Sequence, residues 1–243
     1  MITLSIIIPC LNEQDNVMPI LDQLSQIIKT NNINCEIILV DDQSIDQTYE
    51  KAYEWSLKNH EIKIKILKKS LDKRGYGATV KYGLAHAVGK YAVFVSADLV
   101  DPVELLPRML EKLNSGDDLV QISRYLDKEN SNTIPLNYKF FQVFFRLGVC
   151  VALGLKIPDS TYAFKMFNRT KILAMGIGSK GFNISPEIMF KAVLASLRIS
   201  FISGAQGVRV DGVSKFKFHK EGIGFGVCLI RAFMHRYKIV YWF

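Results

Sequence analysis

Carboxylates follow three of the apolar segments in the first half of the chain. Glu13 comes after the first segment, Asp41 and Asp42 after the second, and Asp98 after a later one. A carboxylate at the end of a strand can accept hydrogen bonds from a nucleobase N–H or from ribose hydroxyls, and its oxygens also suit hard ions such as Mg²⁺ and Mn²⁺. One polar turn means little, but a series of them at one edge of a sheet favours a ligand site.

The same half carries a cationic segment with two glycines. Arg74 precedes Gly75 and Gly77, and the segment opens a helical pattern. Glycines let a backbone approach a ligand, and the start of a helix favours an anion. A plain turn into a helix, next to a solvated run of lysines, would have the same residues. The chain has 31 Lys and Arg against 23 Asp and Glu. The resulting net charge of +8 suits an anionic partner, which could be nucleic acid, a membrane surface or a phosphorylated substrate.

Short apolar segments alternate with amphipathic helical segments through residue 122. Strands are expected at 4–9, 36–40, 91–95 and 119–122, an exposed edge strand at 62–66, and helices at 15–28, 45–57, 77–88 and 102–113. Runs such as LSIIIP do not alternate, which is typical of strands covered on both faces of a parallel sheet. Ligands of such sheets bind beyond the carboxyl ends of the strands, so the carboxylates are expected to gather at that edge.

The second half is less regular. We expect a long helix at 139–153, strands at 163–168 and 198–202, and a helix at 184–197. Residues 220–243 mix basic and aromatic side chains, which favours a helix at a membrane interface over a helix docked on the core. No stretch reaches the ~18 uninterrupted apolar residues of a membrane-spanning helix. The prediction is one domain over 1–218 and a basic-aromatic membrane-interface segment over 219–243.

The composition excludes several classes of protein. With 243 residues, 49% of them hydrophobic, the chain can bury a large core, which excludes disordered, collagen-like and low-complexity proteins. The four cysteines lie far apart, so neither a zinc site nor a disulfide framework is expected, and a reducing, cytosolic compartment fits best. The apolar N-terminus lacks the charged leader of a secretory signal. The lysines follow no recognition-helix pattern, so no nucleic-acid partner is expected.

Several short motifs occur in a fixed order. They are P-x-x-N-E at 9–13, V-D-D-x-S-x-D-x-T at 40–48, G-x-G-A at 75–78, an Asp-Leu loop before Pro at 96–102, S-R-Y at 123–125, P-D-S-T-x-x-F-K at 158–165 and G-V-S-K-F at 212–216. Each is weak alone. In this order and spacing they make the chain resemble the family 2 glycosyltransferases of the GT-A fold. It is most similar to the polyprenyl-phosphate sugar transferases, the group that includes dolichyl-phosphate mannose and glucose synthases.

The resemblance covers nearly the whole chain. It implies an α/β fold of the GT-A, Rossmann-like type, with a mostly parallel sheet, helices on both faces and a C-terminal interfacial amphipathic helix. It also implies a site for a nucleotide-sugar donor. The residues expected at the donor's base and ribose are Pro9, Glu13, Asp41 and Asp42.

The resemblance implies Mg²⁺ or Mn²⁺ as cofactor. Family members usually carry D-x-D in the later loop, where the aspartates hold the metal on the donor diphosphate. Here Ser96 replaces the first aspartate, so Asp98 is the expected metal ligand and donor-binding residue. Weak metal use and loss of activity are the alternatives that follow from Ser96.

The resemblance places phosphate-binding and catalytic residues in the second half. Arg124 lies in a segment similar to the family's phosphate-binding arginine segment, and arginine offers a fork of donors matched to phosphate. Arg209, Ser214 and Lys215 belong to a late loop that closes on the donor and acceptor phosphates in relatives. Asp159 is expected near the acceptor, as a base or a positioning group, because a phosphate with a second pKa of ~6 needs little deprotonation. The expected catalytic residues are Asp159, Arg124 and Arg209.

The resemblance implies inverting transfer of a hexose from a UDP- or GDP-sugar to a polyprenyl phosphate, on the cytoplasmic face of a membrane. Two alternatives stay open: a family 2 transferase with a saccharide acceptor, and a catalytically weak nucleotide-binding paralogue, which Ser96 motivates. The expected partners are the donor, the lipid acceptor and the membrane surface. Many relatives add spanning helices after this point, so we expect either attachment without a span or a membrane protein partner or homo-oligomer.

Overall fold

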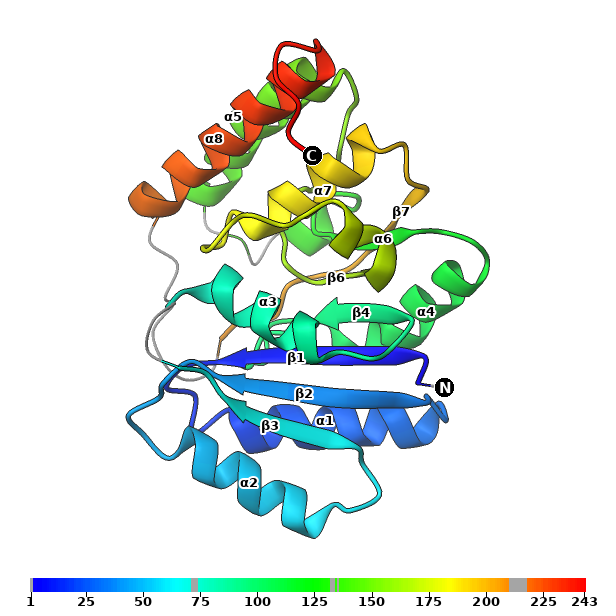
Figure 1. The fold of residues 1–243 in the computed structure, drawn as a ribbon, viewed down its shortest axis with the longest axis vertical. Helices are drawn as coiled ribbons and strands as arrows, with labels where there is room; N and C mark the ends of the chain where they lie inside the picture. The colour runs from blue at the N-terminus through cyan, green and yellow to red at the C-terminus, as the bar shows by residue number, and fades with distance from the viewer. Residues whose placement is uncertain (1, 71–73, 132–133, 135, 210–217) are drawn as a thin grey trace.

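The computed structural model describes residues 2–70, 74–131, 134, 136–209 and 218–243. Within them, seven strands form one sheet in the order β3-β2-β1-β4-β6-β5-β7 (Figure 1). The strands are β1 (Leu4–Cys10), β2 (Cys35–Asp41), β3 (Ile64–Lys68), β4 (Tyr91–Phe94), β5 (Leu119–Ser123), β6 (Lys165–Asn168) and β7 (Ile199–Ser203). The helices are α1 (Val17–Thr30), α2 (Thr48–Lys58), α3 (Tyr76–His86), α4 (Leu106–Asn114), α5 (Leu136–Leu153), α6 (Arg169–Ala174), α7 (Ile184–Leu194) and α8 (Phe218–Arg236), with 3₁₀ turns at Val103–Leu105 and Glu129–Ser131.

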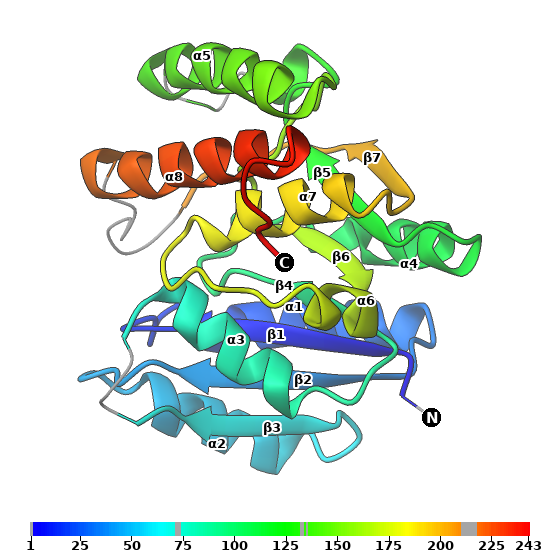
Figure 2. The same cartoon turned by 45° about the horizontal axis from the view of Figure 1, so that its top comes forward.

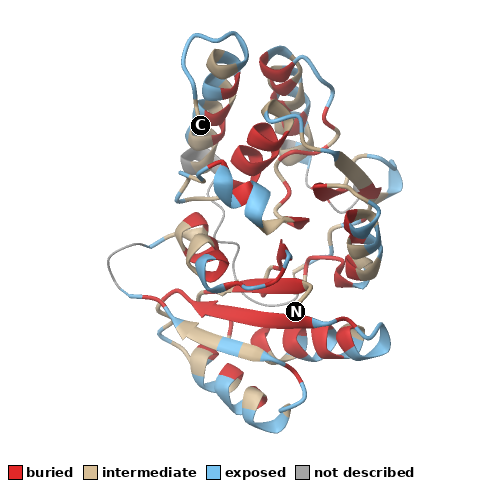
Figure 3. Cartoon of the chain, turned by 45° about the vertical axis from the view of Figure 1, so that its right-hand side comes forward, coloured by how far each residue is buried: buried red, intermediate tan, exposed pale blue. Residues whose placement is uncertain are grey.

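The central strands are buried on both faces. Ile6 and Ile8 of β1 pack in a core cluster with α1, whereas Ile7 packs on the opposite face with residues of α3. Figure 3 shows the central strands buried and the outer faces of the surrounding helices exposed. Two covered faces explain why the sequence of β1 does not alternate. The lysine-bearing β3 lies at the edge of the sheet, as predicted.

The strand order reverses at β1. This strand pairs in parallel with β2 on one side and with β4 on the other. The sheet therefore grows from β1 toward β3 first, and β4 is then added on the opposite side of β1. Sheets of this kind bind ligands in the crevice that the reversal opens beyond the carboxyl ends of the strands. The turns that follow β1 and β4 flank this crevice, and they carry Glu13 and Asp98.

β6 runs against the other strands. It pairs antiparallel with β4 and with β5, whereas β5 and β7 are parallel to each other. Because β6 is reversed, the segment that precedes it, and not the one that follows it, lies at the edge where β5 ends. Asp159 in this segment therefore meets Arg124, which comes directly after β5.

α5 and α8 lie side by side at the end of the molecule away from β3 (Figures 1 and 2). The rings of Phe141 and Phe145 on α5 lie 6.4 and 5.6 Å from the ring of Phe225 on α8, measured between centroids. Cys228 and Ala232 of α8 are buried too, so one face of this helix belongs to the core. None of the helices in the described ranges is long and apolar enough to cross a membrane.

Candidate active site

A cavity of about 890 Å³ lies beyond the carboxyl ends of β1 and β4. Its walls come from the loops after β1, β2 and β4, from the start of α3, from the loop before α7, and from α5 and α8. The lining is charged near the sheet, whereas α5 and α8 contribute mostly aromatic side chains together with Gln142 and Glu221. The residues of the apolar end are Ile134, Tyr138, Phe141, Phe182 and Phe225.

Pro9, near the end of β1, and Glu13, in the turn after it, line the cavity. The Glu13 Oε2 atom accepts a hydrogen bond from Asn16 Nδ2 at 2.8 Å, and the Glu13 amide donates to Thr48 Oγ1 at 2.8 Å. Thr48 opens α2 and Asn16 is the N-cap of α1, so the start of α2 holds the Glu13 backbone and the start of α1 holds its carboxylate. A side chain held in this way presents its acceptor oxygens to a ligand with little loss of entropy.

The two aspartates after β2 have different surroundings. Asp42 lines the cavity, lies 2.7 Å from the ammonium of buried Lys69, and accepts from the Gly75 amide at 3.2 Å. Asp41 is fully buried, and its two carboxylate oxygens accept from the Ser44 amide at 3.2 and 3.3 Å. Asp41 therefore stabilises the turn, while Asp42 is the aspartate that faces the cavity.

Asp98, Glu13 and Arg209 meet in the cavity. Arg209 Nη2 donates to Asp98 Oδ2, and Arg209 Nη1 lies 3.5 Å from Glu13 Oε1. The structure thus brings together three of the residues that we predicted from separate motifs. Two further predicted residues, Ser214 and Lys215, lie outside the described residues.

The carboxylate of Asp98 fits a divalent cation that arrives with a diphosphate. Its Oδ1 atom is buried and has no hydrogen-bond partner among the described residues, which suits an oxygen ligand for Mg²⁺ or Mn²⁺. Ser96 also lines the cavity. The described part of the chain contains no group of three His, Cys, Asp or Glu side chains able to hold a metal. A metal here would need the oxygens of the donor and of water in addition to Asp98.

Asp101 supports the same loop from below the surface. It is buried, and its Oδ2 atom accepts from the Ser96 amide at 2.6 Å. Burial raises the pKa of the Asp101 carboxyl to about 6, against the hydrogen bond from Ser96, which lowers it. Between the ordinary pKa of about 4 and this raised value, the folded state binds more protons than the unfolded state, so Asp101 makes stability fall as pH rises.

Replacing Asp101 by Asn should remove this loss. Between pH 4 and pH 7, the free energy of unfolding of Asp101→Asn should rise relative to that of the wild type by on the order of 2 kcal/mol, because the amide cannot ionise. Thermal unfolding of both proteins across this pH range measures the difference. Stability curves that run parallel from pH 4 to pH 7 would contradict the prediction.

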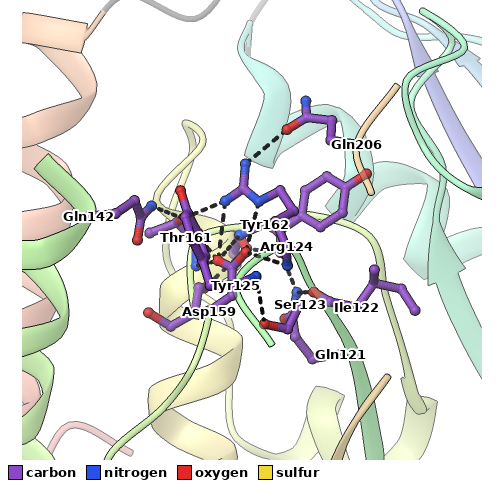
Figure 4. A network of polar contacts seen from close by, with 12 residues as sticks. Gln121, Ile122, Ser123, Arg124, Tyr125, Gln142, Asp159, Thr161, Tyr162 and Gln206 are labelled. Atoms are coloured by element: carbon purple, nitrogen blue, oxygen red, sulfur yellow. Dashed lines mark hydrogen bonds and ion pairs between the residues drawn. The ribbon is translucent and has the colours of Figure 1, made fainter. Parts of the chain in front are cut away.

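Arg124 and Asp159 form a buried ion pair where β5 ends (Figure 4). Arg124 Nε donates to Asp159 Oδ2 at 2.8 Å, and Nη2 donates to Oδ1 at 3.2 Å. Further N–H groups donate to Gln206 Oε1 at 2.9 Å and to Thr161 Oγ1 at 3.2 Å. The guanidinium also lies over the Tyr162 ring, 4.6 Å from its centroid. The orientation of Arg124 is therefore fixed by contacts on several sides.

Asp159 is turned toward Arg124 and the backbone. Its side chain is 0% exposed, and Oδ1 also accepts from the amides of Thr161 and Tyr162 at 3.2 Å each. Burial alone would raise the pKa of this carboxyl, but the charge and hydrogen bonds of Arg124 outweigh burial and hold the pKa below its ordinary value. An ionised, fully engaged carboxylate is suited to positioning Arg124. This geometry favours the positioning group among our two expectations for Asp159.

Sequence reasoning missed several residues that line the cavity. Lys180 and Glu221 lie on its wall, and Gln206 contacts Arg124. Tyr76 and Phe182 stack with their centroids 4.6 Å apart and their planes 8° apart. The two glycines of G-S-K-G could have indicated a close backbone approach around Lys180. Nothing local distinguishes Glu221 from a surface residue of a helix.

This arrangement of sheet, reversal and crevice defines a GT-A fold. Among solved structures, the chain is similar to glucosyl-3-phosphoglycerate synthase from Mycobacterium tuberculosis in complex with Mn²⁺, UDP and phosphoglyceric acid. That match has a TM-score of 0.66 and 18% identity, and covers 98% of this chain and 79% of the other. A complex of the same synthase with Mg²⁺ and UDP matches with a TM-score of 0.65. The predicted GT-A fold with a mostly parallel sheet is confirmed, whereas the interfacial role of the C-terminal helix stays a prediction.

The chain belongs to glycosyl transferase family 2, whose model matches residues 5–175. It is 26% identical to the dolichol-phosphate mannosyltransferase of Pyrococcus furiosus, over 98% of this chain and 64% of the relative. An uncharacterized glycosyltransferase of Synechocystis is 30% identical, over 72% of this chain and 52% of that protein. The dolichyl-phosphate beta-glucosyltransferase of Saccharomyces cerevisiae is 27% identical, over 83% and 66%. The chain thus spans about half to two-thirds of the length of these relatives.

Proposed function

We propose that this protein transfers a hexose from a UDP- or GDP-sugar to a polyprenyl phosphate. The observation that carries the proposal is the single cavity that joins carboxylate-lined loops to an apolar end between α5 and α8. A nucleotide-sugar is polar throughout, so it needs only the first part. A lipid phosphate supplies the anion and the apolar chain that the rest of the cavity suits. The relatives named for dolichyl-phosphate sugar transfer support the same reading.

The donor end would act through fixed acceptors. Glu13, Asp42 and Asp98 line the same cavity. In this proposal Glu13 and Asp42 accept from the base and ribose, and Asp98 acts at the diphosphate. A bound Mg²⁺ or Mn²⁺ would be held by Asp98 and would neutralise charge on the leaving diphosphate. Arg209 contributes a second cation close to the same carboxylate.

The acceptor phosphate would be the nucleophile. One of its oxygens forms a bond to the anomeric carbon while the bond from that carbon to the diphosphate breaks, which inverts the anomeric configuration and releases UDP or GDP. A phosphate monoester is largely ionised at neutral pH, so no strong base is needed. In this proposal Arg124, held by Asp159, aligns the acceptor phosphate with the anomeric carbon of the donor.

A screen of donors tests the proposal. UDP- and GDP-hexoses are each incubated with the protein, Mg²⁺ and detergent-solubilised polyprenyl phosphate, and the release of nucleoside diphosphate is measured. Release that requires the lipid supports the proposal. Release that instead requires a saccharide favours the polysaccharide-type alternative. Tight nucleotide binding without any turnover favours the catalytically weak paralogue, and either result would overturn the proposed reaction.

We also propose that α5 and α8 attach the protein to the cytoplasmic surface of a membrane. α5 exposes an apolar stripe at helical spacing, and α8 exposes further apolar residues. The exposed residues are Leu136, Phe140, Phe144, Leu147 and Val151 on α5, and Ile223, Val227 and Ile230 on α8. Arg231 and Lys238 are exposed near the end of α8 and suit anionic lipids. Attachment here would place the apolar end of the cavity at the bilayer.

Charged residues on α5 should abolish this attachment. Burying one Phe side chain contributes about 1.5–3 kcal/mol, so Phe140→Glu combined with Phe144→Glu should lower binding to anionic vesicles more than about tenfold. Ile45→Glu is the matched control, because Ile45 is 92% exposed but lies in the loop before α2. Vesicle flotation at low salt measures the bound fraction. If the double variant floats as well as the wild type, or if the wild type does not float, the proposed attachment through α5 and α8 is wrong.

A further inference from the structure

The positive charges in the cavity are not equally available. Arg124 is paired with Asp159, and Arg209 lies against both Asp98 and Glu13. Lys180 also lines the cavity, and its ammonium makes no hydrogen bond or ion pair with any residue that the structure describes. A cation already neutralised by a carboxylate attracts a phosphate less than an unpaired one does. Arg74 lines the cavity too, and its guanidinium donates to the neutral Gln43 Oε1 atom at 2.8 and 2.9 Å. Lys180 is therefore the lining cation whose ammonium no described residue engages.

The first residues of the loop that carries Lys180 are held by side chains of α7 and α3. Glu187 of α7 accepts from the amides of Gly178 and Ser179 at 2.9 and 2.7 Å. The ammonium of Lys81 on α3 donates to the carbonyl of Gly178 at 3.2 Å. A loop whose backbone groups are satisfied by side chains in this way has few alternative conformations.

The other side of the loop is held by α3 and α8. The Lys180 carbonyl accepts from the Ala78 amide at 3.1 Å, and Glu221 of α8 accepts from the Phe182 amide at 3.0 Å. The approach to α3 needs a glycine, because a Cβ atom on Gly77 would lie 2.7 Å from the Gly181 carbonyl oxygen. The backbone of Lys180 is thus fixed, while its exposed side chain is not used in holding the loop.

The position of Lys180 lies between the two ends of the cavity. Its backbone contacts the first turn of α3, whose neighbour Gly75 donates to Asp42 at the donor end. Two residues later, Phe182 belongs to the apolar end with Phe225. The phosphate of a lipid acceptor must occupy this same junction, since it links an apolar chain to the point of attack on the donor.

We propose that Lys180 binds the phosphate of the acceptor. This inference rests on the proposed function, and it assigns the acceptor's charge to a residue of the loop between α6 and α7. A lysine offers a compact charge on a flexible stem, so it can follow the phosphate as the new bond forms. Arg124 would then orient the phosphate, while Lys180 provides the net attraction.

The test compares Lys180→Met with Lys180→Arg and with Lys58→Met, an exposed lysine at the end of α2. The probe is a short-chain isoprenyl phosphate, with the corresponding alcohol as reference, added to protein loaded with nucleoside diphosphate and Mg²⁺. We expect Lys180→Met to weaken binding of the isoprenyl phosphate about 10- to 100-fold, the usual effect of losing one hydrogen bond to a charged group. Affinity for the alcohol and for the nucleotide should change less than about twofold. Lys180→Arg should retain most of the binding, and Lys58→Met all of it.

Each other outcome overturns the inference in a recognisable way. If Lys180→Met binds the isoprenyl phosphate as the wild type does, Lys180 is not the acceptor residue, and the proposed function stands. If the variant instead loses nucleotide affinity, Lys180 belongs to the donor diphosphate. If the wild type itself does not distinguish the phosphate from the alcohol and shows no transfer, the proposed function fails and the inference falls with it. Melting temperatures of all variants confirm that the comparison is made between folded proteins.

Discussion

Asp159→Asn is expected to lower the free energy of unfolding by about 3 kcal/mol and turnover per folded molecule by about 10- to 100-fold. The stability loss arises because Arg124 stays charged and largely buried after its partner becomes neutral. We expect the lower end of the range for broken buried pairs, about 3–5 kcal/mol, because the Arg124 side chain keeps 12% exposure and can reach water in the cavity. The loss of turnover arises because an arginine that is no longer held in place aligns the acceptor poorly.

A control and a double variant separate these two effects. Asp118 is a buried carboxylate that pairs with Lys171 at 2.7 Å, and it lies before β5, at the opposite end of the strand from Arg124. Asp118→Asn should therefore lower stability without changing turnover. Arg124→Met combined with Asp159→Leu should recover most of the stability, because an apolar pair can replace a buried ion pair, yet it should remain inactive.

Thermal unfolding and turnover are measured on the same preparations. If Asp159→Asn melts earlier but turns over normally, Asp159 is a structural residue only and leaves the site. If it melts normally but turns over slowly, the carboxylate acts on the substrates directly, and the positioning role is wrong.

Asp98→Asn is expected to remove the metal-dependent part of donor binding. Losing a charged partner in a desolvated site costs about 2–5 kcal/mol, so the gain in nucleoside diphosphate affinity that Mg²⁺ or Mn²⁺ gives the wild type should fall at least about 30-fold. In EDTA, where no metal is available, we expect the opposite effect of Asp98→Asn on nucleotide affinity. The variant should then bind the nucleotide at least as tightly as the wild type, because a carboxylate that repels the diphosphate has gone and Arg209 keeps Glu13 but no longer pairs with a charged Asp98.

Calorimetry with and without metal measures both effects. Ser96→Asp restores the D-x-D pair and should raise the metal-dependent affinity if the loop has the geometry of its relatives. Equal affinity of the wild-type protein for the nucleotide in Mg²⁺ and in EDTA would show that Asp98 holds no metal, and Arg209 would be left as the cation for the diphosphate.

The grouping of the carboxylates in the proposed donor site could be predicted from the sequence because its signals are local. The apolar runs of β1 and β2 identify strands covered on both faces, and each is followed at once by its carboxylates. Once the strands are parallel, their carboxyl ends must share an edge, so Glu13, Asp42 and Asp98 come together. The separate role of Asp41 could not be read in this way, because two adjacent aspartates point in different directions and only the folded turn shows which one is buried.

The rest depended on contacts between distant segments. The ion pair of Arg124 and Asp159 joins residues 35 positions apart, and it forms because β6 runs antiparallel to its neighbours, which no residue near 159 signals. The segment 219–243 was expected at a membrane interface, with a core-docked helix as the alternative. The structure shows a helix with Phe225 and Ala232 buried and Ile223 exposed, so one face packs on the core, and contact of the other face with a membrane stays a prediction. The short helix α6 gave no periodic signal, because six residues make less than two turns.

The cavity with one charged end and one apolar end has a consequence for how the protein meets its substrates. In the proposed function the nucleotide-sugar comes from water and would meet the carboxylate-bearing loops, whereas the lipid comes from the plane of the bilayer and would meet the residues between α5 and α8. The lipid's effective concentration is then its mole fraction in the membrane, not its amount per volume of solution. Diluting the acceptor with inert lipid should slow the reaction even when the total amount of acceptor stays constant, while donor saturation is unaffected.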